Sequence, residues 1–250
     1  MVTSAAAWAE RRPISGDLVI EGLLPQCVAV AEDVSDAPGD ESVLSSAERA
    51  LIATALPERR DQFAAGRGCA RRAMELLGEE PRPVPADATG APVWPSGLVG
   101  SITHCRGYRA AVLARRADVT ALGIDAEPNL GLRDGVLELV SSAGERARLR
   151  ESAALLPHVR VDRLLFSAKE AAYKAWYPLH GIRLGFREAE LTLSGRVYGN
   201  GASGLGDVAE GTFRVRLSER SGAAREFRHE VLHGRWAVRD FLILTAVTLE

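Results

Sequence analysis

The segment Gly123-Ile124-Asp125-Ala126-Glu127 decides the fold of this chain, and it is bounded by an apolar stretch before it and a proline after it. Side chains alternate between the two faces of a β-strand, so Asp125 and Glu127 are predicted to share one face. Ile124 and Ala126 then face a core on the other side. Two carboxylates at the end of a strand form half of a Mg²⁺ site, because proteins hold this ion with one or two carboxylates, water and phosphate oxygens. Taken alone, the segment also describes an edge strand whose acidic face is solvated.

The composition is that of an ordinary globular protein, since 46% of the 250 residues are hydrophobic and 26% are charged. This length allows one large domain or two of about 100–130 residues. The net charge of −2 provides no basic field for nucleic acid. The apolar run 241–247 is shorter than the ~20 residues that span a bilayer, and no signal peptide is visible. We therefore expect a cytoplasmic protein that binds neither nucleic acid nor membranes.

Helical and strand patterns occur on both sides of about residue 120. Capping signals, Pro57 and Gly78 predict helices before this point, and a hairpin at 92–102 and two further strands follow. Beyond it, apolar patterns predict helices at 138–142, 145–154 and 162–179, strands at 189–193, 212–217, 236–239 and 241–249, and a loop at 194–211. We expect an α+β fold made of two similar α/β halves, residues 1–120 and 121–250.

Lysine is confined to one short segment, because only Lys169 and Lys174 among the 31 basic residues are lysines. An ammonium group differs from a guanidinium in geometry, hydration and ease of pKa shift, so this segment could require one. Glu170 and Lys174 are neighbours on one face of the predicted helix. They describe either a surface ion pair or a functional pair. Ser167 with Glu170 also matches a capping box.

The functional alternative makes Glu170 a third carboxylate beside Asp125 and Glu127 around one cation. Lys169 and Lys174 would then stand near phosphate charge or handle a proton. Arginines of the earlier helix give a second ambiguous pattern, which is either a solvated basic face or a clamp for a phosphate-bearing ligand. These arginines are Arg59, Arg60, Arg67, Arg71 and Arg72.

Three motifs resemble those of the 4′-phosphopantetheinyl transferases. GIDAE at 123–127, followed by FSAKEAAYKAW at 166–176, is similar to the two-part signature of that family. GSITHC at 100–105 resembles its (Ser/Thr)-His segment. The chain length and WPSG at 94–97 resemble the Sfp-like branch, especially the actinobacterial single-chain type.

The resemblance implies a pseudo-twofold protein that binds coenzyme A in the cleft between its halves. The family moves the phosphopantetheine arm of coenzyme A to a serine of an apo acyl or peptidyl carrier protein and releases 3′,5′-adenosine bisphosphate. It implies Mg²⁺, or Mn²⁺ in its place, as the metal cofactor. We expect a monomer, because both halves of the cleft come from one chain.

The resemblance also implies site roles. Asp125, Glu127 and Glu170, all from the C-terminal half, are expected to hold the metal. Glu170 is also the candidate base, Lys174 the candidate phosphate stabiliser and His104 a neutral hydrogen-bond donor to phosphate. The remaining expected contacts to coenzyme A are Arg59, Arg67, Thr103 and Lys169. The other histidines are expected to be structural, and they are His158, His180, His229 and His233.

One departure from the family pattern lies in the loop 85–90, which has no basic residue where the family often has lysines. Either Arg82 substitutes for them or the arginines of the earlier helix bind the 3′-phosphate. Two other functions stay open from the residues alone. One is a Mg²⁺-dependent phosphohydrolase acting on a nucleotide-containing substrate, and the other is a non-catalytic protein that binds coenzyme A or a carrier domain.

Overall fold

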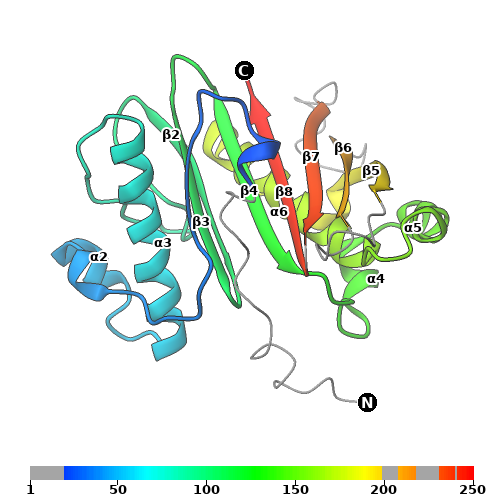
Figure 1. The fold of residues 1–250 in the computed structure, drawn as a ribbon, viewed down its shortest axis with the longest axis horizontal. Helices are drawn as coiled ribbons and strands as arrows, with labels where there is room; N and C mark the ends of the chain where they lie inside the picture. The colour runs from blue at the N-terminus through cyan, green and yellow to red at the C-terminus, as the bar shows by residue number, and fades with distance from the viewer. Residues whose placement is uncertain (1–19, 199–207, 218–230, 240) are drawn as a thin grey trace.

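The computed structural model describes residues 20–198, 208–217, 231–239 and 241–250. The chain forms two antiparallel sheets, each covered by one 20-residue helix (Figure 1). The first sheet has the order β1-β3-β2, with β1 at Ala29–Asp33, β2 at Leu98–Cys105 and β3 at Tyr108–Arg115. The second has the order β4-β8-β7-β6-β5, with strands at Ala121–Pro128, Leu242–Leu249, Val231–Arg239, Val208–Leu217 and Ala189–Tyr198. This mixed architecture confirms the predicted α+β class.

The two long helices are α3 at Pro57–Leu76, on the first sheet, and α6 at Val161–His180, on the second. The shorter helices are η1 at Glu21–Leu23, η2 at Glu41–Val43, α2 at Ser46–Leu51, α4 at Val136–Val140, α5 at Ala143–Leu155 and η3 at Phe186–Glu188. The predicted capping box before α2 is present, and Gly78 follows α3 with the positive φ of 77° that favours glycine. None of the described helices is long and apolar enough to span a bilayer.

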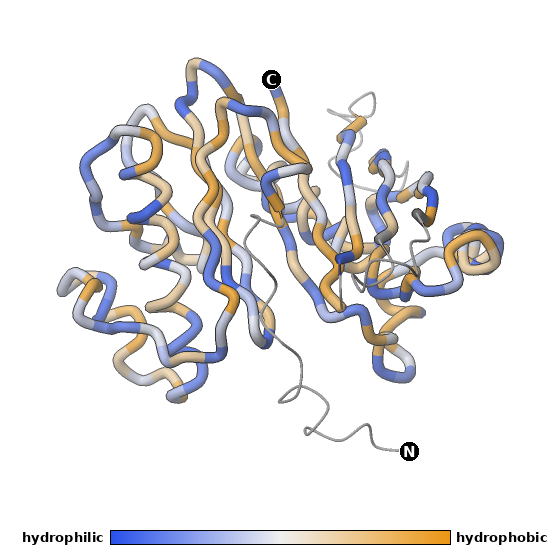
Figure 2. Tube along the Cα trace, in the orientation of Figure 1, coloured by the Kyte–Doolittle hydropathy of each residue, from blue (hydrophilic) through white to orange (hydrophobic). Residues whose placement is uncertain are grey.

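Helix α6 lies directly on β4 because Gly123 has no side chain. A Cβ atom at this position would stand 1.9 Å from Ala171 O and 2.7 Å from Ala175 N, which is far inside van der Waals contact. Ile124 and Ala126 point to the other side of β4, as predicted, and are buried in the core between the sheets. Figure 2 shows hydrophobic residues gathered along these central strands.

Side-chain hydroxyl groups join the two sheets where β2 runs beside β4. The Ile124 amide donates to Ser101 Oγ at 3.0 Å, and the Ala126 amide donates to Thr103 Oγ1, also at 3.0 Å. The two donors are two residues apart on β4, and the two acceptors are two residues apart on β2, so each pair shares one face of its strand. The contacts bring the GSITHC segment beside Asp125, although the two motifs belong to different sheets.

The predicted hairpin at 92–102 is wrong. Strand β2 pairs with β3 instead, whereas Pro92 forms only an isolated bridge with Ala86. Trp94 lies against Gly100, since a Cβ there would be 2.9 Å from the indole ring. The Trp94 side chain therefore packs on β2, and the Trp94 backbone does not pair with it as a strand.

Two further predictions of local structure need correction. Ser167 lies inside α6, where its hydroxyl bonds Thr245 Oγ1 at 2.9 Å, so it caps no helix. The expected loop at 194–211 is shorter, because β5 and β6 extend into it and its remaining part, 199–207, lies outside the described residues. Gly195 and Gly211 pair across these strands beside Trp236, whose ring would collide with a Cβ at Gly195.

Candidate active site

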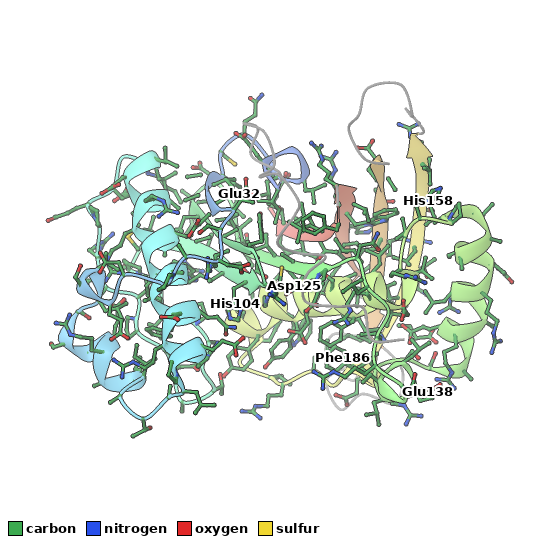
Figure 3. All side chains as sticks on the ribbon, turned by 60° about the horizontal axis from the view of Figure 1, so that its bottom comes forward. Glu32, His104, Asp125, Glu138, His158 and Phe186 are labelled. Carbon is green, nitrogen blue, oxygen red and sulfur yellow. The ribbon has the colours of Figure 1, made fainter. Side chains whose placement is uncertain are left out.

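A cavity of about 460 Å³ lies between α3 and α6, above the place where β2 and β4 run side by side. Figure 3 shows two of its residues, His104 and Asp125, close together in the centre of the molecule. Of the residues expected to form the site, all but Lys169 line this cavity. They are Arg59, Arg67, Thr103, His104, Asp125, Glu127, Glu170 and Lys174.

Asp125 is the most enclosed carboxylate of the cavity, with 6% of its surface exposed. Its Oδ1 accepts a hydrogen bond from Lys174 Nζ at 2.7 Å and one from Thr103 Oγ1 at 3.3 Å. Lys174 also donates to Ile124 O at 3.1 Å. The other oxygen, Oδ2, is buried and has no hydrogen-bond partner among the described residues. A buried carboxylate oxygen without a partner is costly, so a ligand is expected there.

Glu127 follows on the same face of β4, as predicted, and its Oε2 accepts a hydrogen bond from Arg163 Nη1 at 2.9 Å. Burial raises the pKa of Glu127 to about 7, with a further contribution from the Asp125 charge, while Arg163 opposes the shift. Burial and Asp125 also raise the pKa of Glu170, although Lys174 opposes this. The Asp125 charge thus makes ionisation of both neighbouring carboxylates less favourable.

This donor set fits a hard cation only in part. Three carboxylates line one cavity, and one of them has a buried oxygen with no partner among the residues that the structure describes. Oxygen atoms are the ligands that Mg²⁺ prefers. Among the described residues, however, no three His, Cys, Asp or Glu side chains are already gathered closely enough to hold an ion. A cation here would need further oxygens from a ligand or water.

His104 is bonded to an arginine, because Arg59 Nη1 lies 3.2 Å from its Nε2. A guanidinium can only donate, so Nε2 accepts and the ring proton is on Nδ1. Burial, with the charges of Arg59 and Lys174, lowers the pKa of His104 to about 4. The imidazole is therefore neutral near pH 7.

Arg67 is a buried cation at the cavity. Only 6% of its surface is exposed, its Nε donates to Val84 O at 3.0 Å, and its guanidinium lies 3.9 Å from the centre of the Phe63 ring. Burial lowers the pKa of Arg67 to about 10, so it stays charged at neutral pH. Its Nη2 is buried without a partner among the described residues, which favours an anionic ligand in the cavity.

The other arginines of the predicted clamp are engaged elsewhere. Arg60 pairs with Glu41 and Arg71 with Glu48, in both cases at 2.6 Å. Arg82, the cation nearest to the loop 85–90, lies 3.8 Å from Glu79. These contacts leave Arg59 and Arg67 as the arginines of α3 that line the cavity.

The structure does not bring Lys169 to the cavity. Its side chain is almost completely buried and donates to Val140 O at 2.9 Å and Phe186 O at 2.7 Å. It also pairs with Glu145, at 2.8 Å from Oε1 and 3.0 Å from Oε2. Glu145 in turn caps the N-terminus of α5. The contacts assign Lys169 to holding α5 and α6 together, because every donor faces a protein acceptor.

The sequence patterns did not predict several residues that line the cavity, including aromatic ones. Phe63, Phe166, Tyr173 and Tyr177 face the cavity, and the last two pack together with ring centres 5.6 Å apart. Their helical spacing of four was the available signal, but it describes core residues equally well. Residues 89–92 form another wall, and Tyr177 Oη lies 3.4 Å from Asp87 at its edge.

Within the described parts of the chain, His104 is the one histidine that lines the cavity. His158 lies at the periphery in Figure 3, His180 packs its ring 3.8 Å from that of Trp176, and His233 is exposed on β7. His229 lies outside the described residues.

Two family models match different parts of the chain. The model of the 4′-phosphopantetheinyl transferase N-terminal domain matches residues 47–114, and that of the 4′-phosphopantetheinyl transferase superfamily matches residues 121–237. The 4′-phosphopantetheinyl transferase Svp of Streptomyces mobaraensis is 45% identical over 232 residues, which cover 92% of this chain and 89% of Svp. The chain belongs to the 4′-phosphopantetheinyl transferase superfamily.

Two more actinobacterial relatives of this family match over nearly their whole length. Npt of Nocardia iowensis is 42% identical and PptT of Mycobacterium tuberculosis 40%, each over 92% of this chain and over 99% and 98% of the relative. The family transfers the 4′-phosphopantetheine arm of coenzyme A to carrier proteins. The predicted family, branch and enzyme class are thereby confirmed.

Proposed function

We propose that this transferase is Mg²⁺-dependent and that Asp125, Glu127 and Glu170 hold the ion against the pyrophosphate of coenzyme A. The observation that carries the proposal is the buried Oδ2 of Asp125, which has no partner in the described part of the chain and belongs to a cavity that the other two carboxylates also line. A bound Mg²⁺ would neutralise developing phosphate charge and orient the reacting group. Pyrophosphate oxygens and water would complete a coordination that the side chains do not complete alone.

We assign the nucleotide end of coenzyme A to Arg59 and Arg67. Arg67 offers its Nη2, which has no partner within the described ranges, and Arg59 reaches the cavity beside His104. The loop 85–90 has no base, and Arg82 is paired with Glu79, so these two arginines replace the lysines that the family often has there. Guanidinium groups match phosphate oxygens well. Thr103 and His104 are the expected phosphate contacts on β2, with Nδ1 as the donor of His104.

The reaction requires a base and a stabilising cation, which we assign to Glu170 and Lys174. As the carrier serine oxygen bonds the phosphorus that carries pantetheine, its proton passes to Glu170. The bond from this phosphorus to the bridging oxygen breaks, and 3′,5′-adenosine bisphosphate leaves. Lys174, one helical turn after Glu170, stabilises the phosphate charge. Lys169 does not contact coenzyme A in this proposal, because its ammonium group already donates to Glu145 and to two carbonyl groups.

We further propose that residues 1–120 and 121–250 are the two halves of a monomer that works in the cytoplasm. The gap between β3 and β4, residues 116–120, supports this boundary. The cavity supports a monomer, because both helices that enclose it belong to one chain.

One experiment tests the function. The protein is incubated with coenzyme A, Mg²⁺ and an apo carrier protein, and the mass of the carrier is measured with and without EDTA. We expect the mass of one phosphopantetheine arm to be added only when a divalent cation is present. Cleavage of coenzyme A with no change in carrier mass would instead indicate a hydrolase, and binding without either change a non-catalytic protein. Full transfer in EDTA would refute the metal assignment.

A further inference from the structure

Arg163 stands in the first turn of α6, and all its side-chain nitrogens donate hydrogen bonds. Nη1 donates to Glu127 Oε2 at 2.9 Å, Nε to Leu130 O at 3.0 Å and Nη2 to Gly131 O at 3.1 Å. The side chain is not part of the cavity lining. One planar group thus connects a cavity carboxylate to the backbone that follows β4.

Neighbouring contacts attach the same loop to the start of α6. The Leu132 amide donates to Asp162 Oδ2 at 2.7 Å. Asn129 Nδ2 donates to His158 O, and Asn129 Oδ1 accepts from the Arg160 amide, both at 2.8 Å. These bonds hold the loop without contacting the cavity, which distinguishes them from the Arg163 contact.

The site depends on how α6 lies on β4, since β4 carries Asp125 and Glu127 while α6 carries Glu170 and Lys174. Near the start of β4, Gly123 allows the close approach of the helix. At its end, the Arg163 guanidinium ties the strand to the first turn of α6. Together with the contact between Lys174 and Asp125, these attachments on either side of Asp125 determine the relative position of the carboxylates.

We propose that Arg163 is a positioning residue that orients Glu127 for a divalent cation. This inference rests on the proposed metal-dependent function. Because Arg163 holds Oε2, the other oxygen, Oε1, is the one available to a ligand. A lysine carries a compact charge on a flexible stem and lacks the planar fork that reaches three acceptors at once.

The direction in which metal affinity changes when Arg163 is replaced distinguishes an orienting role of this side chain from an effect of its charge. A cation beside a metal site repels the metal, so, while Glu127 stays ionised, loss of the Arg163 charge alone would tighten metal binding. Loss of orientation would weaken it, and partners of metal ligands typically contribute 10–100-fold to metal affinity.

The test compares Arg163→Ala and Arg163→Lys with two matched controls. Asp162→Ala removes a loop contact without touching Glu127, and Arg160→Ala removes an exposed arginine three residues away. Mn²⁺ binding is measured by titration calorimetry on the folded protein, and the Mg²⁺ concentration for half-maximal transfer is measured in parallel. For Arg163→Ala we expect the Kd for Mn²⁺ and the Mg²⁺ concentration for half-maximal transfer to rise by about tenfold each. The kcat at saturating Mg²⁺ should change much less. Arg163→Lys should fall in between, and both controls should stay near wild type.

Unchanged or tighter Mn²⁺ binding in Arg163→Ala would overturn the assignment. If this variant does not fold, Arg163→Lys decides, and wild-type Mn²⁺ affinity in it would be the contrary result. A wild-type protein that binds no Mn²⁺ would refute the proposed metal site itself, and the Arg163 assignment with it. The two failures are therefore distinguishable.

Discussion

Lys174 Nζ lies 2.7 Å from Asp125 Oδ1 and joins the helix to the strand at the centre of the site. The ammonium also donates to Ile124 O at 3.1 Å. One carboxylate oxygen is therefore occupied by α6, whereas Oδ2 remains buried without a partner among the described residues. Asp125 can thus contact Lys174 and a ligand at the same time.

Asp125→Asn should abolish most activity while leaving the fold intact. The amide keeps the size of the side chain but removes the charge that we assign to the metal. Transfer should fall by about 10²–10³-fold, the usual effect of losing one electrostatic group from an active site. Carrier mass gives the rate, and circular dichroism confirms folding. Glu170→Gln should behave alike, and near-normal transfer in either variant would contradict the metal assignment.

Arg67→Met should weaken binding of coenzyme A more than it slows the chemical step. A hydrogen bond to a charged group contributes about 1.5–3 kcal/mol, which corresponds to roughly a 10–100-fold rise in KM. Arg60→Met is the matched control, because Arg60 belongs to the same helix but pairs with Glu41. Steady-state kinetics with varied coenzyme A would measure both. Equal KM values in the two variants would argue against Arg67 as a phosphate contact.

Lys169→Met should reduce stability rather than affinity for coenzyme A. Breaking a buried ion pair leaves the partner charge unpaired and costs about 3–5 kcal/mol, and the side chains of Lys169 and Glu145 are 2% and 1% exposed. Urea unfolding should show the loss, and replacing both residues with apolar ones should restore part of it. A Lys169→Met variant that keeps its stability but has a raised KM for coenzyme A would indicate that Lys169 binds coenzyme A.

Stability should depend on the protonation of His104. Its pKa is lowered to about 4 in the fold, against 6.5 as the ordinary value. The unfolded chain therefore binds a proton first, and stability should decline as the pH falls from about 6.5 to 4. Between pH 7 and 5 this contributes about 2 kcal/mol.

The measurement is urea unfolding at both pH values for wild type, His104→Gln and His233→Gln. The His104 variant should lose this part of the pH dependence, while the exposed His233 serves as control. An identical pH dependence in wild type and His104→Gln would contradict a neutral, half-buried imidazole.

Local sequence patterns predicted most helices and strands, because strand alternation and helix capping depend on residues close together in the chain. The alternation at Ile124 and Ala126 marks a core face, and the pairing of Ser45 with Glu48 marks a helix start. The hairpin prediction failed at Pro92 and Trp94, because strand pairing depends on partners distant in the chain. Trp94 instead packs on Gly100, a contact without a local signal.

The sequence by itself determined the family, the α+β class and the two carboxylates of β4, since those follow from motifs and from the period of a strand. It could not separate Lys169 from Lys174, because both belong to one helical segment. Only tertiary packing placed Lys174 on Asp125 and Lys169 on Glu145. The burial of Asp125 Oδ2 and the contact of the Arg163 guanidinium with Glu127 were likewise decided in three dimensions, because burial and hydrogen-bond geometry arise only when α6 lies on β4.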